Sequence, residues 1–150
     1  GKGQIAMEQL IKTSLRMRPD RIIVGEVRGR EVMDMVQAMN TGHDGSLSTG
    51  HGNSVQGMVR RLDSMYLQAA NFPVSAIRTQ IAEALDIFVH LGKVERLGRR
   101  VLEISELAGV HDGEVVFNPL FKFDRGTGLV ATGNTLTRTQ KLMLHGEEWS

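Results

Sequence analysis

The spacing of hydrophobic and polar positions changes about half-way along the chain. In the first half, apolar runs alternate with apolar residues at helical spacing. An apolar run within 21–26 predicts a parallel strand buried on both faces, and 45–49 predict a second short strand. Helical spacing predicts four helices: one from about residue 5 that stops before Pro19, one over 31–40, one capped by Asn53 or Ser54, and one that begins near Pro73.

The second half of the chain has the pattern of antiparallel strands. Segments 86–91, 99–109 and 113–123 are strand-like, and Gly-containing stretches separate them. Residues 125–128 form a further turn, and 136–146 predict a short helix. The sequence therefore predicts one α/β domain over 1–150, with an αβαβα core over about 1–85 and a β-hairpin extension with a helix over 86–150.

Composition limits the classes of protein that fit this pattern. The chain has 150 residues, 41% hydrophobic and 23% charged, which is ordinary for one globular domain. Its net charge of +1 favours neither nucleic acid nor a membrane surface by itself, although local clusters such as "RLGRR" at 96–100 remain candidate contact patches. Without cysteine there is no disulfide and no thiolate metal site, and no apolar run approaches the length of a membrane span.

Polar side chains follow both strands of the first half. Glu26 comes at the end of the first strand, and Thr49 and His51 at the end of the second. Ligands bind beyond the carboxyl ends of strands in open α/β sheets, so these side chains share one crevice if the strands are neighbours. A carboxylate there can polarise a water or help to organise Mg²⁺ around a polyphosphate. The alternative is a salt-bridged glutamate beside a surface histidine.

The histidines do not predict a metal site. His43 and His51 are eight residues apart across a strand, and this spacing lacks the geometry of a helical metal pair. The pairs Arg60-Arg61 and Arg99-Arg100 are expected to be solvated, with contact to a neighbouring subunit's phosphate as the functional alternative.

A longer pattern joins these features. It comprises Leu15-Arg16, Pro19-Asp20, Gly25-Glu26, Arg28, Thr41-Gly42-His43 and Thr49-Gly50-His51. With this pattern the chain resembles the secretion-superfamily ATPases of type II secretion, type IV pili and type IV secretion. The wording "RMRPDRIIVGEVRG" and "DMVQAMNTGHDGS" is most similar to the Flp/Tad-pilus assembly ATPases.

The resemblance implies a fold, a reaction and roles for individual residues. The fold is the C-terminal part of a RecA-like P-loop NTPase core, with an antiparallel extension and a terminal helix. Glu26 is the implied water-activating acid of an atypical Walker B motif, in which Gly25 replaces the Mg²⁺-binding aspartate. Gly25, Thr49 and His51 are the implied nucleotide-binding residues, the last two in a His box. For Arg16, Arg28 and His43 the resemblance implies structural or intersubunit contacts.

The resemblance also implies cofactors and partners. Proteins of this family are hexameric rings that use ATP and Mg²⁺ to drive pilus assembly or protein secretion. The implied location is cytoplasmic, held to the inner membrane through platform proteins, with no direct contact to nucleic acid.

One motif of the family is missing from the sequence. There is no G-x-x-x-x-G-K-[ST], whose backbone amides and lysine hold phosphates. We therefore expect the C-terminal part of an ATPase, with half an active site and no activity alone. A non-catalytic oligomerisation or regulatory module and a DNA-transfer type IV secretion ATPase remain alternatives.

Two structural expectations follow from this reading. The parallel sheet should have one open edge, which either a second copy or the antiparallel half covers. Gly50 and Gly52, on either side of His51, are expected to loosen the His box.

Overall fold

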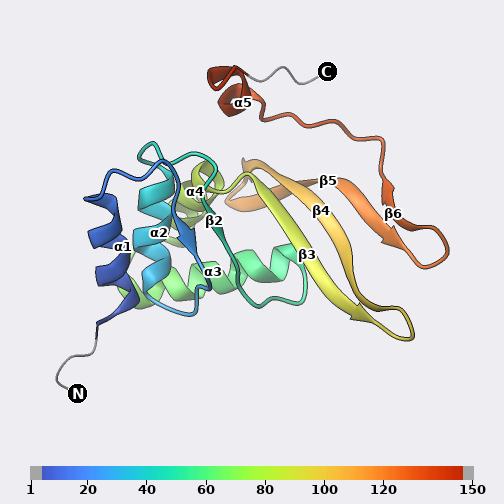
Figure 1. Cartoon of the computed structure of the whole chain (residues 1–150), viewed down its shortest axis with the longest axis horizontal. Coiled ribbons are helices and arrows are strands. Elements are labelled where there is room, and N and C mark those ends of the chain that lie inside the picture. Colours follow the sequence, from blue (N-terminus) through green and yellow to red (C-terminus); the bar gives the residue numbers. More distant parts are fainter. Residues whose placement is uncertain (1–4, 147–150) are drawn as a thin grey trace.

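The computed structural model describes residues 5–146, and it separates a helical half from a long antiparallel sheet (Figure 1). The elements in chain order are α1 (Met7–Leu15), β1 (Ile23–Val24), α2 (Glu31–Met39), β2 (Leu47–Ser48), α3 (Val55–Ala69), α4 (Val74–Ala84), β3 (Ile87–Val94), β4 (Gly98–His111), β5 (Glu114–Asp124), β6 (Gly128–Ala131) and α5 (Gln140–Leu144). No described helix has the length and apolar character needed to cross a bilayer. The α/β class and the antiparallel extension are confirmed.

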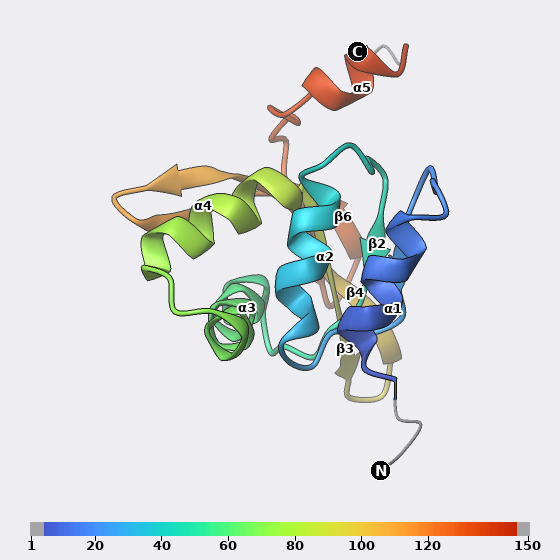
Figure 2. The same cartoon turned by 90° about the vertical axis from the view of Figure 1, so that its left-hand side faces the viewer.

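The helices begin where the sequence places their caps. The hydroxyl of Ser54 accepts a hydrogen bond from the backbone N–H of Gly57 at 2.9 Å and so caps α3. Pro73 precedes the first residue of α4. Side by side in Figure 2, α2, α3 and α4 bury one apolar cluster. Its fully buried members include Val32, Val36, Leu62, Tyr66, Ile77 and Ile81.

The two parallel strands are shorter and less buried than predicted. β1 pairs with β2 so that Ile23 lies opposite Leu47. Val24 points into the core and is 4% exposed, whereas Ile23 is 72% and Leu47 62% exposed. The prediction of a strand buried on both faces is therefore wrong for β1. Helices cover one face of this pair, and no other part of residues 5–146 covers the second.

The antiparallel sheet has the strand order β3-β4-β5-β6. Its last strand, β6, was not predicted, because its four residues begin within the predicted turn at 125–128 and are too few to show an alternating pattern. β3 forms no ladder with β1 or β2, so the antiparallel half does not hydrogen-bond to the open edge of the parallel pair. Phe88 and Phe117 stack edge to face at 5.2 Å where the sheet meets the helices.

A buried carboxylate fastens the segment after β6 to the sheet. Glu106 is fully buried and accepts hydrogen bonds from the backbone N–H groups of Thr137 at 3.1 Å and Arg138 at 2.6 Å. The guanidinium of Arg138 donates in turn to the carbonyls of Leu85 at 3.1 Å and Leu107 at 2.9 Å. These bonds join the terminal segment to both halves of the molecule.

Truncating this carboxylate should destabilise the whole chain. Glu106→Ala removes a buried acceptor and leaves the backbone N–H groups of Thr137 and Arg138 without it, so we expect the free energy of unfolding to fall by about 3 kcal/mol. Urea denaturation followed by circular dichroism measures this loss. The matched control is Glu95→Ala, an exposed glutamate, which should change stability by less than about 0.5 kcal/mol. Equal effects of the two variants would contradict the role of Glu106.

The contribution of Glu106 should also depend on pH. Burial raises its pKa, but the hydrogen bonds outweigh that effect and hold the pKa below the ordinary value of 4.5. Its stabilising effect is therefore complete above pH 4.5 and is lost as the pH falls through the lowered pKa of the folded state. The stability difference between the parent chain and Glu106→Gln should shrink in acid, as measured by urea denaturation at neutral and at acidic pH. A difference that stays constant with pH would contradict this assignment.

Candidate functional site

The loops that follow β1 and β2 are joined by hydrogen bonds. The hydroxyl of Thr49 donates to the carbonyl of Gly25 at 2.6 Å, and the backbone N–H of Val27 donates to the carbonyl of Thr49 at 2.9 Å. These bonds continue the parallel pairing past the ends of the strands. As a result, Glu26 on one loop lies beside His51 on the other.

The carboxylate of Glu26 lies between the side chains of Arg28 and His51. Arg28 donates from Nη2 to Oε2 of Glu26 at 2.5 Å. Nε2 of His51 lies 2.9 Å from Oε1, but the contact lacks hydrogen-bond alignment, and Oε1 is a buried atom with no hydrogen-bond partner among residues 5–146. Glu26 is 23% exposed, whereas the side chain of Arg28 is 78% exposed. In this site one carboxylate oxygen accepts a hydrogen bond from Arg28, and the other lies within ion-pair distance of His51 without a hydrogen bond among residues 5–146.

The surrounding charges keep this acid ionised. The hydrogen bond from Arg28 is the largest cause of a lowered Glu26 pKa, burial acts against it, and the charges of Arg28, His51 and Arg61 add to it. The same contact raises the pKa of Arg28 above its ordinary value. Arg61, on α3, therefore belongs to the electrostatic surroundings of Glu26, a role that the sequence did not predict beside a solvated position or contact to a neighbouring subunit's phosphate.

Glu31 fixes the backbone of the loop that carries Arg28, and sequence reasoning missed it. Its Oε1 accepts hydrogen bonds from the backbone N–H groups of Arg28 at 2.5 Å and Gly29 at 3.0 Å. The only signal was an acidic residue in the first turn of a helix, which favours such contacts to free N–H groups. The loop is therefore held while the Arg28 side chain stays at the surface.

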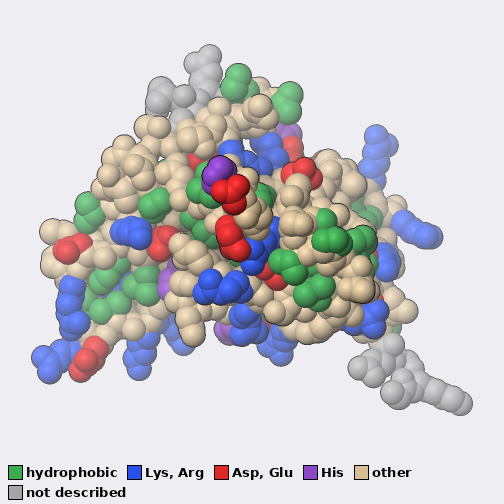
Figure 3. All heavy atoms as spheres, turned by 180° about the vertical axis from the view of Figure 1, so that it is seen from behind, with side chains coloured by type: hydrophobic (Ala, Val, Ile, Leu, Met, Phe, Trp, Pro, Cys, Tyr) green, Lys and Arg blue, Asp and Glu red, His purple; other side chains and the backbone are tan. Residues whose placement is uncertain are grey.

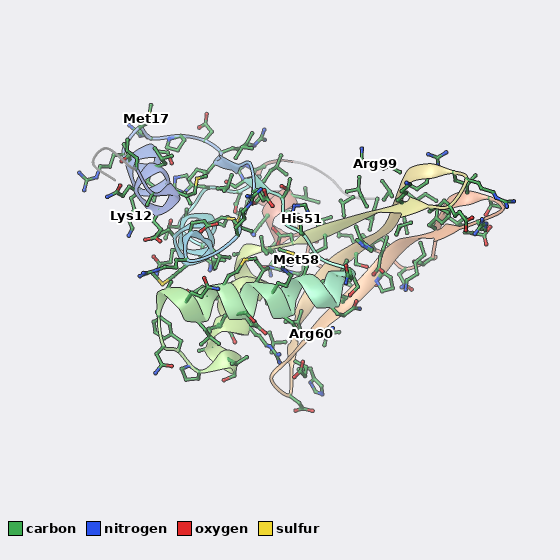
Figure 4. All side chains as sticks on the ribbon, turned by 90° about the horizontal axis from the view of Figure 1, so that it is seen from below. Lys12, Met17, His51, Met58, Arg60 and Arg99 are labelled. Carbon is green, nitrogen blue, oxygen red and sulfur yellow. The ribbon has the colours of Figure 1, made fainter. Side chains whose placement is uncertain are left out.

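Gly50 and Gly52 bring the His-box loop close to α3. A Cβ atom at Gly50 would lie 2.3 Å from Cε of Met58, and one at Gly52 would lie 3.3 Å from the Met58 backbone. Figure 4 shows His51 and Met58 together at this contact. The lack of a side chain at these positions permits close packing of the loop on α3, and the expectation that the glycines loosen the loop stays a prediction.

The other candidate residues lie apart from Glu26. His43 follows α2, and its Nδ1 lies 2.9 Å from the carbonyl of Ala38. Arg16 is the C-cap of α1. Within the described part of the chain, no hydrogen bond or ion pair joins either residue to Glu26. Their positions fit the structural alternative among the two roles proposed from sequence.

A groove of about 880 Å³ runs from these loops along β2 and β3. Four candidate residues line it, Gly25, His43, Thr49 and His51, together with the exposed apolar residues Ile23, Leu47, Ile87, Val89 and Leu91. The edges of β2 and β3 that border it pair with no strand among residues 5–146. Residues 5–146 contain no group of three or more His, Asp or Glu side chains placed to hold a metal ion.

Comparison with known proteins identifies the class. Residues 1–103 match the type II/IV secretion system protein family, and the chain belongs to this family. It is 36% identical over 126 residues to a putative conjugal transfer protein of Mycobacterium tuberculosis, which covers 84% of this chain and 35% of that protein. It is 35% identical over 105 residues to the type IV secretion system protein PtlH of Bordetella pertussis, which covers 67% of this chain and 31% of PtlH.

A solved structure has a similar fold. The VirB11 ATPase from the type IV secretion system of Brucella suis matches with a TM-score of 0.64 and 30% identity, over 67% of this chain and 31% of that one. The chain thus spans about a third of the length of the relatives it matches. The family predicted from the motifs is confirmed, and the roles of single residues stay predictions.

Removing the guanidinium of Arg28 should raise the pKa of Glu26. In Arg28→Gln the strongest cause of the lowered pKa is gone, so the carboxyl should titrate closer to its ordinary value of 4.5. Carbon-13 NMR of the Glu26 carboxyl during an acid titration measures the change. Arg30→Gln is the matched control, since Arg30 pairs with Glu8. The same Glu26 pKa in the parent chain and Arg28→Gln would show that Arg28 does not hold the acid.

Proposed function

We propose that this chain is the C-terminal part of a secretion ATPase and contributes the hydrolytic side of its nucleotide site. The observation that carries the proposal is Oε1 of Glu26, at the carboxyl ends of two parallel strands. This oxygen lies 2.9 Å from Nε2 of His51 and has no hydrogen-bond partner among residues 5–146. An acceptor in this position can receive a proton from an attacking water. Thr49 and His51, which line the groove, are then placed to face the terminal phosphate.

The groove along β2 and β3 is where we propose that the rest of the RecA-like core packs. We propose that a strand bearing the phosphate-binding loop lies there, since both bordering edges are open and the groove has apolar walls. Mg²⁺ would supply charge neutralisation for the phosphates of ATP. The residues on this chain would hold the water and the terminal phosphate, while the absent motif would hold the rest of the nucleotide.

Arg28 sets the condition under which Glu26 can act. A carboxylate whose pKa is lowered is a weak base, so the contact with Arg28 opposes proton transfer. The Arg28 side chain is exposed and can leave without disturbing the core, because Glu31 holds only its backbone. We infer that Glu26 can accept a proton once Arg28 leaves it and binds another anion. The terminal phosphate of ATP is the anion that this site would bring to Arg28.

The transport process served by this ATPase is a finer proposal. The Flp/Tad-like wording of the motifs supports pilus assembly by a hexameric ring that is cytoplasmic and held to the inner membrane by platform proteins. The relatives named for conjugal transfer favour DNA transfer as the second candidate. Deleting the gene and measuring both surface pili and the frequency of conjugation separates the two.

Nucleotide binding by the chain alone tests the half-site. With the phosphate-binding loop absent, calorimetry with ATP and Mg²⁺ should detect no micromolar binding, and Glu26→Gln should behave like the parent chain. Micromolar binding, worth about −8 kcal/mol, would contradict the proposal, because the phosphates would then be held without that loop.

The role of Glu26 is tested in a longer chain that includes the phosphate-binding loop. Glu26→Gln should retain ATP binding and lower the rate of hydrolysis by at least about 100-fold, since the amide cannot accept the proton. Glu83→Gln on α4 is the control and should hydrolyse ATP at the parent rate. Parent-rate hydrolysis by Glu26→Gln would show that Glu26 is not the water-activating acid, and no hydrolysis by the longer parent chain itself would favour the non-catalytic module.

A further inference from the structure

Met58 on α3 packs against the loop that carries His51, which we define as the His-box loop, residues 49–54. A Cβ atom at Gly50 would lie 2.3 Å from Cε of Met58 and 3.2 Å from its Sδ. A Cβ atom at Gly52 would lie 3.1 Å from Cβ of Met58 and 3.3 Å from its Cα and backbone N. The thioether of Met58 therefore fills the space of a side chain at residue 50, and the start of α3 fills the space of one at residue 52.

The side chain of His51 contributes little to its own placement. It is 82% exposed, and its Nε2 lies 2.9 Å from Oε1 of Glu26 without hydrogen-bond alignment. Among residues 5–146, no hydrogen bond holds the imidazole ring. The distance between His51 and Glu26 therefore depends on where the backbone of the His-box loop lies.

Hydrogen bonds hold the two ends of the His-box loop. At one end the hydroxyl of Thr49 donates to the carbonyl of Gly25 at 2.6 Å, and at the other the hydroxyl of Ser54 accepts from the N–H of Gly57 at 2.9 Å. In the described part of the chain, residues 50–53 between these ends form no hydrogen bond. The middle of the loop is therefore supported by packing, and Met58 supplies the closest contacts.

The position of Met58 is set by α3 and not by the loop. Its backbone N–H donates to the carbonyl of Ser54 at 2.9 Å, in the first turn of the helix. Further along α3, Asp63 pairs with Nε of Arg78 at 3.0 Å, and Nη1 of Arg78 lies 2.6 Å from Glu114. Figure 3 shows this side of the molecule, where acidic and basic side chains lie next to one another. These ion pairs join α3 to α4 and to the sheet, so the helix is a rigid support for the loop.

We propose that Met58 is a positioning residue, whose side chain holds the His-box loop at the distance at which His51 lies beside Glu26. The inference rests on the proposed function, because it gives that geometry a purpose in hydrolysis. Met58 acts through the loop and not on the nucleotide. Its flexible thioether can follow the contour of a loop backbone that has no side chain at residue 50 or 52.

NMR relaxation of the backbone N–H of His51 tests this role on the chain alone. The order parameter should be about 0.85 in the parent chain, as for a rigid backbone, and should fall below about 0.6 in Met58→Ala. The pKa of the Glu26 carboxyl should rise in the same variant, because the charge of His51, one of the causes that lower this pKa, moves away.

The matched control removes the same side chain elsewhere on the helix. Met65 lies about two turns further along α3 and is 3% exposed in the core. Met65→Ala should lower the stability of the chain, as judged by urea denaturation, and should leave the order parameter of His51 at the parent value. A general loss of stability is thereby separated from a loss of positioning.

Exchanging side-chain volume between loop and helix is a second test. Gly50→Leu alone should raise the mobility of His51, because the new side chain overlaps the thioether of Met58. Adding Met58→Ala to Gly50→Leu should restore the order parameter, since the leucine then fills the vacated space. Met58→Ala should not rescue Gly52→Ala, because Cα and the backbone N of residue 58 stay in place.

Hydrolysis in the longer chain that includes the phosphate-binding loop tests the purpose of the contact. Met58→Ala should lower kcat about 10-fold and change KM less than about twofold, because a displaced His51 affects the reaction more than nucleotide binding. The Gly50→Leu, Met58→Ala exchange should recover most of kcat. If the longer parent chain does not hydrolyse ATP, the proposed function fails, and the order parameters still decide whether Met58 positions His51.

Two results would overturn the proposal. The first is the same order parameter at His51 in the parent chain and in Met58→Ala. A low value in both would mean that the glycines loosen the loop whatever Met58 does. The second is an equal fall in Met58→Ala and in Met65→Ala, which would make the effect one of stability.

Discussion

The parallel pairing of β1 with β2 is the contact on which the candidate site depends. The ladder itself is two residues long on each strand. Hydrogen bonds on both sides extend it, from the N–H of Ile22 to the Ser46 hydroxyl at 2.9 Å and from the N–H of Val27 to the Thr49 carbonyl at 2.9 Å. Because the two strands run in the same direction, their carboxyl ends lie at the same edge, and Glu26 from one loop lies beside His51 from the other.

Most of the local structure could be predicted from the sequence because it depends on nearby residues. Ser54 and Pro73 mark helix starts, and Glu26 and His51 mark strand ends, through chemistry that is visible within a few positions. What could not be predicted depends on distant neighbours. The exposure of Ile23 follows from which side the helices cover, and the burial of Glu106 follows from donors about 30 residues further along the chain. The contact of Arg28 with Glu26 is close in sequence, but it requires a loop shape that Glu31 determines.

The two halves of the molecule meet through polar contacts as well as apolar ones. Arg138 donates to carbonyls on both sides of the junction, and Lys141 lies 2.8 Å from Asp86, just before β3 begins. Arg78 on α4 pairs with Asp63 on α3 at 3.0 Å and reaches the carbonyl of Gly113 in the turn before β5 at 2.8 Å. The angle between the helices and the sheet is thus set by directional bonds, which fixes the width of the groove between β2 and β3.

The bare face of the parallel pair has a consequence for handling the chain in isolation. Ile23 and Leu47 form an apolar patch that is exposed to solvent in this chain. It lies next to unpaired strand edges that can hydrogen-bond to the backbone of another strand. Such a surface makes the solution behaviour of the chain depend on protein concentration, with reversible clustering as the chain becomes crowded. The solubility of the chain then measures whether the groove is occupied, because a segment that binds in the groove covers the apolar patch that causes the clustering.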